Sequence, residues 1–376
     1  MHPEFPLAPE IIYLNHAAVS PWPLRTCAAV QQFANENSRL GATHYPRWMA
    51  REQTLRQQLQ TLLNAPSADH IALVKNTSEA ISFVATGLDW HAGDNIVTSA
   101  EEFPSNRLPW EALQERGVVL READLMAAAS PEQALFDQVD QRTRLIAISS
   151  VQYASGLRMD LGRIGHFCRG HGILFLVDAI QSLGALSLDV QACQADFVMA
   201  DGHKWLLAPE GLGVFYLSST GLQRLKPTEY GWHMTTRPGD YDNRQWEVSR
   251  SARRFECGSP NMLGIHALSA SLSLVLDTGP DVIEQAILAR TARIIECIQA
   301  SDTLECLSLR EPERRSGITV FRHRRVANEA LWRYLKSNGV VCAQRGGGIR
   351  YAPHFYTPME HLQHAVTLAA NAPLTS

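Results

Sequence analysis

Residues 173–181, which read ILFLVDAIQ, and residues 197–205, which read FVMADGHKW, decide the fold of this chain. In each stretch an apolar run of strand length is followed directly by a carboxylate, Asp178 in the first and Asp201 in the second. The second stretch continues into His203 and Lys204. Uniformly apolar runs of this length are typical of strands buried on both faces of a sheet. We therefore predict that Asp178 and Lys204 each follow the end of their own buried strand.

The same alternation of helix and strand extends outward from these two stretches. Strand-like apolar runs occur at 71–74, 95–98, 118–120, 145–148 and 213–217, and helical periodicity occurs at 48–63, 78–88, 110–115, 131–139 and 161–171. Strands that alternate with helices predict a mostly parallel sheet covered on both faces. The fold class is therefore α/β.

The pattern changes towards the C-terminus. A polar stretch with Pro and Gly begins near residue 220, and from residue 261 long helices dominate, followed by short strands around Ile318 and Val340. We predict a large domain at 23–255 and a smaller C-terminal α+β domain at 256–376. Residues 1–22 are predicted to form an N-terminal segment that packs with the small domain.

The chain has the composition of an ordinary globular protein, since 45% of its 376 residues are hydrophobic and 19% are charged. Its 34 basic and 38 acidic residues give a net charge of −4, which is not the footprint of a protein that binds nucleic acid or an anionic membrane. We find no apolar stretch of membrane-spanning length and no export signal. Seven cysteines without a C-x-x-C pair favour neither a disulfide framework nor a zinc site, and no metal site is predicted. We expect a cytoplasmic protein.

Polar side chains follow several of the apolar runs, where the predicted strands end. They are Asn76, Thr77 and Ser78 after the first run, Tyr153 after 145–148, Asp178 and Gln181 after 173–177, and His203 and Lys204 after 197–200. In an open α/β sheet, ligands bind at the carboxyl ends of the strands. Pyridoxal 5'-phosphate (PLP) needs a lysine for a Schiff base, a carboxylate opposite its pyridine nitrogen and a cradle for its phosphate, which a helix start with hydroxyl side chains supplies. The set therefore predicts PLP as the cofactor.

Further motifs extend this pattern from YLNHAA at 13–18 to IRYAPHFY at 349–356. The most specific are VDAIQ at 177–181 and GHKW at 202–205, in this order and at this spacing. With these motifs the chain resembles the class V aminotransferase family of fold-type I PLP enzymes, which includes cysteine desulfurases, isopenicillin N epimerase-like proteins and kynureninases. The resemblance implies a PLP-dependent transferase fold with a mostly parallel, seven-stranded type of sheet flanked by helices.

The resemblance also implies roles for individual residues. Lys204 would form the Schiff base and move the α-proton of the substrate, and Asp178 would pair with the pyridine nitrogen. The remaining cofactor contacts would be Asn76, Thr77, Ser78 and His203 at the phosphate, Gln181 at the ring hydroxyl, Phe103 stacked on the ring, and Ser259 at the phosphate of the neighbouring subunit. Arg350 would bind the substrate carboxylate, with Asn15 and Tyr153 as further substrate contacts. The role of Ser259 implies a homodimer with active sites at the subunit interface.

Three features depart from the desulfurase branch of this family. The desulfurase branch stacks a histidine over the ring. This chain has Phe103 at that position, as kynureninase-like members do. Asp201 stands where a serine often holds the phosphate, and its charge would repel a dianion. Residues 342–349 (CAQRGGGI) form a shortened loop, in which Cys342 continues an apolar run and is interpreted as a buried strand residue. We therefore predict that the protein is not a cysteine desulfurase.

The shared residues leave the reaction open, because transamination, racemisation and β-elimination all need Lys204, Asp178 and Arg350. We predict an aminotransferase that acts on an α-amino acid. The alternatives are an amino-acid epimerase and a β-lyase that cleaves a carbon–sulfur or similar bond, which Phe103 and VQYASG at 151–156 favour as kynureninase-like features. A protein that only holds PLP as a sensor is a further alternative, against which the intact catalytic set argues. Trp232 and His233 are candidates for a substrate contact across the dimer.

Overall fold

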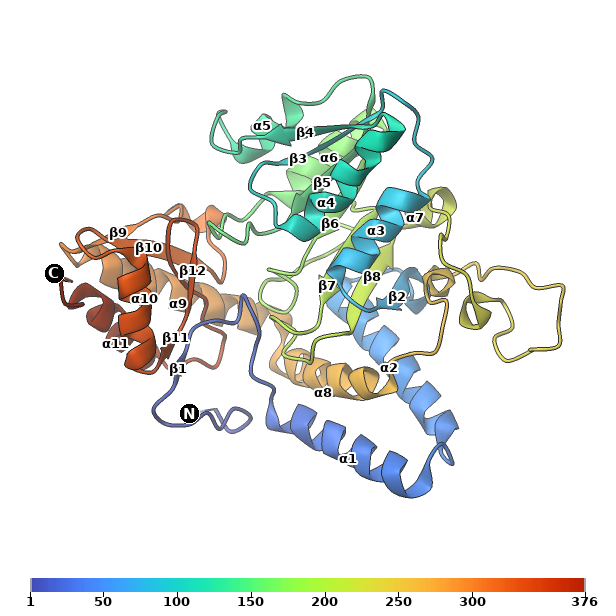
Figure 1. Cartoon of the computed structure of the whole chain (residues 1–376), viewed down its shortest axis with the longest axis horizontal. Coiled ribbons are helices and arrows are strands. Elements are labelled where there is room, and N and C mark those ends of the chain that lie inside the picture. The colour runs from blue at the N-terminus through green and yellow to red at the C-terminus, as the bar shows by residue number, and fades with distance from the viewer. Residues whose placement is uncertain (1, 375–376) are drawn as a thin grey trace.

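A central sheet runs through the larger part of the molecule, which is described for residues 2–374 by a computed structural model. The sheet has seven strands in the order β2-β8-β7-β6-β5-β3-β4 (Figure 1). They are β2 (Ile71–Val74), β3 (Asn95–Ser99), β4 (Val119–Ala123), β5 (Thr143–Ser149), β6 (Leu174–Asp178), β7 (Phe197–Asp201) and β8 (Gly213–Leu217). β8 is antiparallel to both of its neighbours, and the other pairs are parallel. The prediction of a mostly parallel sheet is confirmed.

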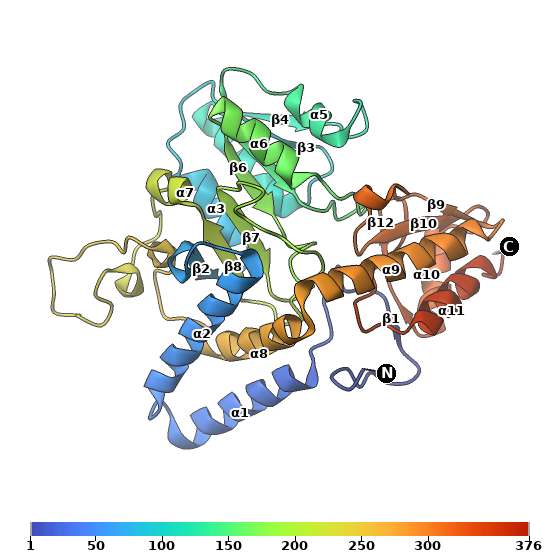
Figure 2. The same ribbon diagram turned by 180° about the vertical axis from the view of Figure 1, so that it is seen from behind.

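Helices cover both faces of this sheet because its strands bury side chains on both sides. On β6, Phe175 and Val177 belong to one apolar core, and Leu174 and Leu176 belong to another. The first core includes side chains of α2 (Tyr45–Leu63), α5 (Pro131–Phe136), α6 (Leu161–His171) and α8 (Met262–Thr278). The second includes side chains of α3 (Thr77–Gly87), α4 (Leu108–Glu111) and α7 (Ser219–Arg224). Figures 1 and 2 show these layers from opposite sides.

The C-terminal part has an apolar core and a sheet of its own. Its antiparallel strands follow the order β12 (Ala343–Arg345), β13 (Gly348–Tyr351), β10 (Thr319–His323) and β9 (Leu304–Cys306). The helices are α9 (Pro280–Gln299), α10 (Asn328–Ser337) and α11 (Met359–Ala370). From the N-terminus, β1 (Ile12–Tyr13) pairs in parallel with β11 (Val340–Val341). An α/β part with a smaller α+β part agrees with the predicted fold class, whereas the domain limits at residues 22 and 255 stay predictions.

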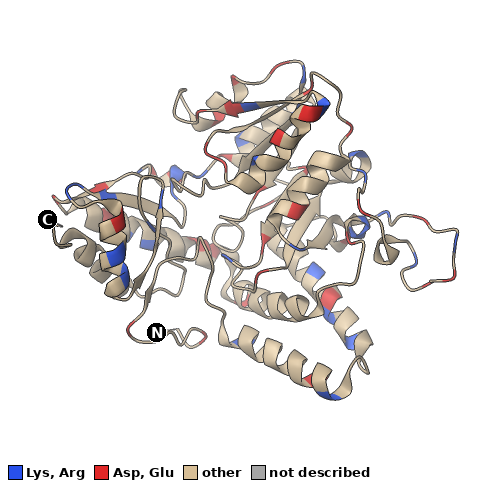
Figure 3. Cartoon of the chain, viewed as in Figure 1, with Lys and Arg blue, Asp and Glu red and all other residues tan. Residues whose placement is uncertain are grey.

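Within residues 2–374, no single helix has the length and apolar character of a membrane span. α8 and α9 reach that length and character only when taken together, and they meet at an angle of 81°. Basic and acidic residues are mixed over both parts of the molecule (Figure 3), in line with the small net charge.

Helix α1 (Leu24–Leu40) has no counterpart in the sequence-based prediction. The reason is that Thr26 is its only buried residue, so the helix lacks the apolar stripe on which such a prediction depends. Polar contacts, together with the ring of Phe33 packed 4.7 Å from that of His266, hold α1 on α8 instead. Thr26 Oγ1 lies 2.6 Å from Ser271 Oγ, and Arg25 Nη1 donates to Asp277 Oδ2 at 2.8 Å.

A projecting arm, defined here as residues 226–250, extends from the body of the molecule after α7 (Figure 1). It carries three large and well exposed aromatic side chains: Tyr230 is 63% exposed, Tyr241 is 75% exposed and Trp246 is 53% exposed. The side chain of His233, near the start of the arm, is buried. The arm is therefore fixed at its base and presents apolar surface along its length.

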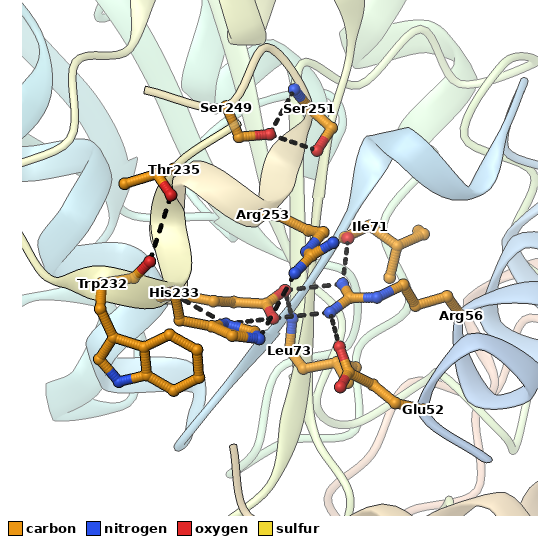
Figure 4. A network of polar contacts seen from close by, with 11 residues as sticks. Glu52, Arg56, Ile71, Leu73, Trp232, His233, Thr235, Ser249, Ser251 and Arg253 are labelled. Carbon is orange, nitrogen blue, oxygen red and sulfur yellow. Dashed lines mark hydrogen bonds and ion pairs between the residues drawn. The ribbon is translucent and has the colours of Figure 1, made fainter. Parts of the chain in front are cut away.

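A buried network of charged groups holds that base against α2 and β2 (Figure 4). Arg56 donates from Nη1 to Glu256 Oε1 and from Nη2 to Glu256 Oε2, each at 2.6 Å, and Nη2 also donates to Glu52 Oε1 at 2.6 Å. The backbone N–H of Leu73 donates to Glu256 Oε1 at 2.9 Å. His233 Nδ1 lies 4.0 Å from Glu256 Oε2. The side chains of Arg56, Glu52 and Glu256 are each 4% exposed, so little water competes for these bonds.

The substitution Glu256→Ala is expected to destabilise the protein strongly. It leaves Arg56 buried with a single carboxylate partner, and breaking a buried ion pair costs about 3–5 kcal/mol. Urea denaturation followed by circular dichroism measures the change. Glu329→Ala is the control, because its ion pair with Arg333 lies on the exposed face of α10 and contributes far less. Equal stability of the two variants would contradict this account of the network.

Candidate active site

A cavity of about 340 Å³ lies where β6 and β7 end and α3 begins. It is lined by ten of the residues predicted to form a site: Asn76, Thr77, Ser78, Phe103, Tyr153, Asp178, Gln181, His203, Lys204 and Arg350. A larger cavity of about 520 Å³ is lined by Arg158, Asp160 and Arg314 among others, but no lysine lines it. A third cavity of about 470 Å³ is lined by Lys75, but this lysine is exposed and pairs with Glu79 at 2.7 Å. Lys204 forms no such ion pair among the described residues, which makes the cavity at the ends of β6 and β7 the candidate location for lysine chemistry.

Lys204 and Asp178 are the central charged pair of the cavity. Asp178 is 1% exposed, and its Oδ1 accepts a hydrogen bond from Ile180 N at 3.0 Å. Burial raises the pKa of Asp178, as does the nearby Glu102, while Lys204 acts in the opposite direction. Burial lowers the pKa of Lys204, although the carboxylate of Asp178 partly opposes this shift. Each group thus favours its neutral form more than it would in water.

The start of α3 forms one end of the cavity. Asn76 caps this helix, since its Oδ1 accepts from Glu79 N at 2.9 Å, and the following residues present N–H groups and hydroxyls. Thr77 is buried, and its Oγ1 has no hydrogen-bond partner among the described residues. A helix start with a free hydroxyl suits a phosphate group. This end of the cavity therefore fits the phosphate of PLP.

His203 and Asp201 face the same end of the cavity. His203 Nδ1 lies 3.2 Å from Asp201 Oδ2 but makes no hydrogen bond within residues 2–374, and Asp201 Oδ1 likewise has no partner there. Unsatisfied buried polar atoms are uncommon and indicate a missing ligand or water. Thr77 and His203 can therefore each donate to a bound phosphate, whereas the carboxylate of Asp201 only accepts and suits a donor such as a water.

Gln181 links the cavity wall to two other segments. Its amide oxygen accepts from Trp205 Nε1 at 3.1 Å, and its amide nitrogen donates to Ala17 O at 3.0 Å. An amide nitrogen carries two hydrogens, so one remains for a ligand such as a ring hydroxyl. The prediction for Gln181 is compatible with this geometry.

Phe103 and Tyr153 form an aromatic wall of the cavity. Their rings meet edge to face with centroids 5.2 Å apart, and Lys204 Nζ lies 5.7 Å from the centroid of the Phe103 ring. The ring of Phe103 is 42% exposed, which is unusual for a phenylalanine and leaves surface free for an aromatic ligand. The position agrees with a residue that stacks on a cofactor ring.

Arg350, on β13, lies in the wall that the C-terminal part contributes. It is 3% exposed, its Nη1 donates to Tyr153 O at 2.9 Å, and its Nε has no partner within the described chain. Burial and the nearby Arg345 lower its pKa to about 10, so it remains a cation at neutral pH. A buried guanidinium with an unused donor suits a carboxylate.

Four residues singled out from the sequence do not line this cavity. Ser259 is exposed and lines another cavity together with Lys75 and Glu229. Asn15 forms a bridge to Ala352, two residues beyond Arg350, and its buried Oδ1 has no partner among the described residues. Trp232 and His233 belong to the projecting arm and its base. Their predicted roles stay predictions.

The structure also adds residues to the cavity that the sequence reasoning missed. These are Ser105, Glu210 and Arg345, together with the short segment Ala17, Ala18 and Val19. Ser105 carried a usable signal, because it lies one 3₁₀ turn after Phe103 and its Oγ accepts from Ser78 at 2.7 Å. Arg345, at the exposed end of β12, and Glu210, in an exposed loop, reach the cavity only in the folded chain.

The segment before Arg350 is a β-hairpin made of β12 and β13. Gly346 has a φ of +60°, and a Cβ there would lie 2.2 Å from Ala154 O, so glycine is required at this turn. Cys342 precedes the hairpin and is buried, and burial raises the pKa of its thiol to about 12. The interpretation of Cys342 as a buried residue agrees with the structure.

Known proteins similar to this chain include several that act on sulfur amino acids. The chain is 30% identical to a probable cysteine desulfurase of Methanothermobacter thermautotrophicus, over 96% of this chain and 94% of that protein. It is 35% identical to a cysteine desulfurase of Klebsiella pneumoniae, over 72% and 67%. Among solved structures, a mutant of C-DES with glycine covalently linked to its PLP cofactor superposes with a TM-score of 0.92 at 23% identity, covering 98% of this chain and 99% of that one. The complex of the cystine C–S lyase C-DES with its product cysteine persulfide gives 0.88 at 24% identity, over 96% and 98%.

These relatives overturn the predicted reaction. The predictions of an aminotransferase, and of a protein that is not a cysteine desulfurase, are wrong, because the relatives are a probable cysteine desulfurase and a cysteine desulfurase. The physical reason is that Lys204, Asp178 and Arg350 serve every reaction of the family alike, so they do not select the bond that breaks. The alternative of a carbon–sulfur lyase agrees better with these findings.

A family model, aminotransferase class V, matches residues 12–361. This range spans the sheet, the cavity and almost all of the C-terminal part. The resemblance inferred from VDAIQ and GHKW is therefore confirmed, as is the fold of PLP-dependent transferases of fold type I. The chain is a member of the class V aminotransferase family.

Proposed function

We propose that this protein is a PLP-dependent enzyme that cleaves the carbon–sulfur bond of a cysteine-type amino acid, cysteine or cystine. The observation that carries the proposal is the shared cavity, in which Lys204 and Asp178 face a buried Arg350 with a free donor. Relatives that are cysteine desulfurases or a cystine C–S lyase point to sulfur as the leaving group. PLP as the cofactor is confirmed by membership of the family.

PLP, when bound, supplies an electron sink that weakens the bonds at the α-carbon of an amino acid. We assign the phosphate to the start of α3, with Thr77, Asn76, Ser78 and His203. Gln181 would donate to the ring hydroxyl, and Phe103 would cover one face of the ring. Asp178 would keep the ring nitrogen protonated. Burial raises the pKa of Asp178, but the positive charge of a protonated ring nitrogen would lower that pKa again and keep the carboxylate ionised.

The substrate would be held and deprotonated by two basic residues. Arg350 would bind the α-carboxylate through its free donor, with Tyr153, whose carbonyl accepts from Arg350, and Asn15, which bridges to Ala352, as further substrate contacts. For cystine, Lys204 Nζ would take the α-proton and return it to the sulfur that leaves the β-carbon. Because burial lowers its pKa, Lys204 is neutral, and hence basic, at a lower pH than an exposed lysine.

The test is a product analysis with L-cystine and, separately, with L-cysteine plus an acceptor thiol. Cystine and water give pyruvate, ammonia and cysteine persulfide, whereas cysteine and the thiol give alanine and a persulfide of that thiol. No cysteine lines the described cavity to accept the sulfur. The assay therefore measures the carbon product, pyruvate or alanine, and the persulfide as the sulfur product. The expected result is carbon–sulfur cleavage of at least one substrate that disappears in Lys204→Ala. Failure to cleave either substrate by an enzyme loaded with PLP would overturn the proposal.

We further propose that the enzyme is a homodimer with active sites at the subunit interface. Ser259 is exposed and lies outside the cavity of its own chain, as expected for a residue that reaches a neighbouring subunit. The projecting arm exposes Tyr230, Tyr241 and Trp246, an apolar surface typical of an interface. Sedimentation analysis tests this proposal. A cytoplasmic location rests on the sequence and stays a prediction.

A further inference from the structure

Glu102 is a buried carboxylate beside the cavity that none of the roles above uses. It follows the end of β3, directly before Phe103, and is 4% exposed. Its Oε1 accepts from Ser149 N at 2.6 Å and from Gln152 Nε2 at 2.9 Å, and its Oε2 accepts from Ser149 Oγ. Within residues 2–374 no arginine or lysine forms an ion pair with Glu102. Burial raises the pKa of its carboxyl group.

A buried carboxylate without a cationic partner is costly, and three hydrogen bonds from one short segment offset that cost only in part. These three donors belong to residues 149–152, the segment that leads from β5 to Tyr153, and the side chain of Asn106 lies beside the same carboxylate. The carbonyl of Tyr153 accepts from Arg350 Nη1 at 2.9 Å, and its ring packs edge to face on Phe103. Glu102 thus connects the two sides of the cavity that face the substrate.

We propose that Glu102 is a positioning residue for substrate binding. It fixes the segment 149–153 so that Tyr153 O orients the guanidinium of Arg350, and it anchors the adjacent Phe103 in the cavity wall. Glu102 does not line the cavity itself, so its effect passes through these neighbours. The inference deepens the proposed function and rests on the assignment of Arg350 to the substrate carboxylate.

Two conservative substitutions separate positioning from an effect of charge on nearby Asp178. Glu102→Gln removes the charge but keeps the shape, since its amide oxygen can accept from Ser149 N and Gln152 Nε2, while its amide nitrogen can donate to Ser149 Oγ. Glu102→Asp keeps the charge but is one methylene shorter and cannot hold all three donors. A positioning role predicts that Gln restores function and Asp does not, and a charge effect predicts the opposite.

The readout is binding as well as turnover. We expect Glu102→Asp to weaken the binding of L-alanine to the PLP-loaded enzyme by about tenfold, as loss of one well-oriented hydrogen bond to a charged group implies, with a matching rise in the KM for cystine. Glu102→Gln should stay within about twofold of the wild type by the same scale. In the protein without PLP, hydrogen exchange of the amides of residues 149–153 should be faster in the Asp variant alone.

Glu132→Asp is the matched control. Glu132 is also fully buried and binds a backbone amide, Asp160 N at 2.9 Å, as well as Arg314, but it does not line the cavity. The substitution Glu132→Asp should lower the thermal stability of the protein without weakening the binding of L-alanine. The proposal is overturned if Glu102→Gln weakens binding as much as Glu102→Asp, or if Glu102→Asp weakens it no more than Glu132→Asp. Binding of L-alanine does not depend on cleavage, so failure of the proposed reaction is seen separately, as an absence of sulfur products in the wild type.

Discussion

Lys204→Ala is expected to abolish turnover, with a fall on the order of 10⁴-fold or more, the upper range for loss of a positioned acid–base group. The substitution removes both the amine that attaches the cofactor and the base at the α-carbon. Among the described residues, Lys204 is the only lysine that lines the cavity, so no other lysine of the cavity wall can take its place. Steady-state assays with the sulfur substrate measure the loss.

The attachment itself is checked by borohydride reduction of the PLP-loaded enzyme and peptide mapping. The pyridoxyl group should lie on Lys204 in the wild type and be absent in Lys204→Ala. Lys336→Ala is the control, because this lysine packs over Trp332 on α10, far from the described cavity, and its removal should leave label and turnover unchanged. A label on Lys75 or Lys336 in the wild type would contradict the assignment.

Asp178→Asn is expected to leave PLP bound while turnover falls on the order of 10²–10³-fold, the usual effect of removing one electrostatic group from an active site. Asparagine keeps the shape and the hydrogen bond from Ile180 N but has no charge to hold a proton on the ring nitrogen. Equilibrium dialysis of PLP and steady-state kinetics give the two quantities. Near-normal turnover would show that Asp178 only caps the turn that follows β6.

The sequence could predict that Asp178 and Lys204 meet at one cavity, because strand ends are visible in the order of residues. Asp178 and Lys204 follow uniformly apolar runs, and parallel strands bring such ends to one edge of the sheet. Cys342 was recognised as buried for the same reason, because it continues an apolar run. The pattern of apolar residues thus places the groups that follow buried strands.

Other parts of the site depend on contacts between exposed turns, which leave no apolar pattern. Arg345 and Glu210 reach the cavity from a hairpin and a loop, and α1 packs on α8 through polar side chains. Glu102 was not singled out from the sequence, since its donors come from the end of a different strand. The reaction was mistaken because the groups that the motifs identify are those common to the whole family.

The contacts between the N-terminal segment and the C-terminal part can form only after most of the chain has been synthesised. His16 Nε2 lies 2.6 Å from Tyr356 OH, although the two residues are 340 positions apart, and β1 waits for β11 as its partner. Burial lowers the pKa of His16 to about 4, so this hydrogen-bonded junction is uncharged at neutral pH. During synthesis the segment from Asn76 to Lys204 has left the ribosome long before Arg350 is made. Contacts of such long range form late, so the residues that we propose to hold the cofactor are expected to come together before Arg350 joins them.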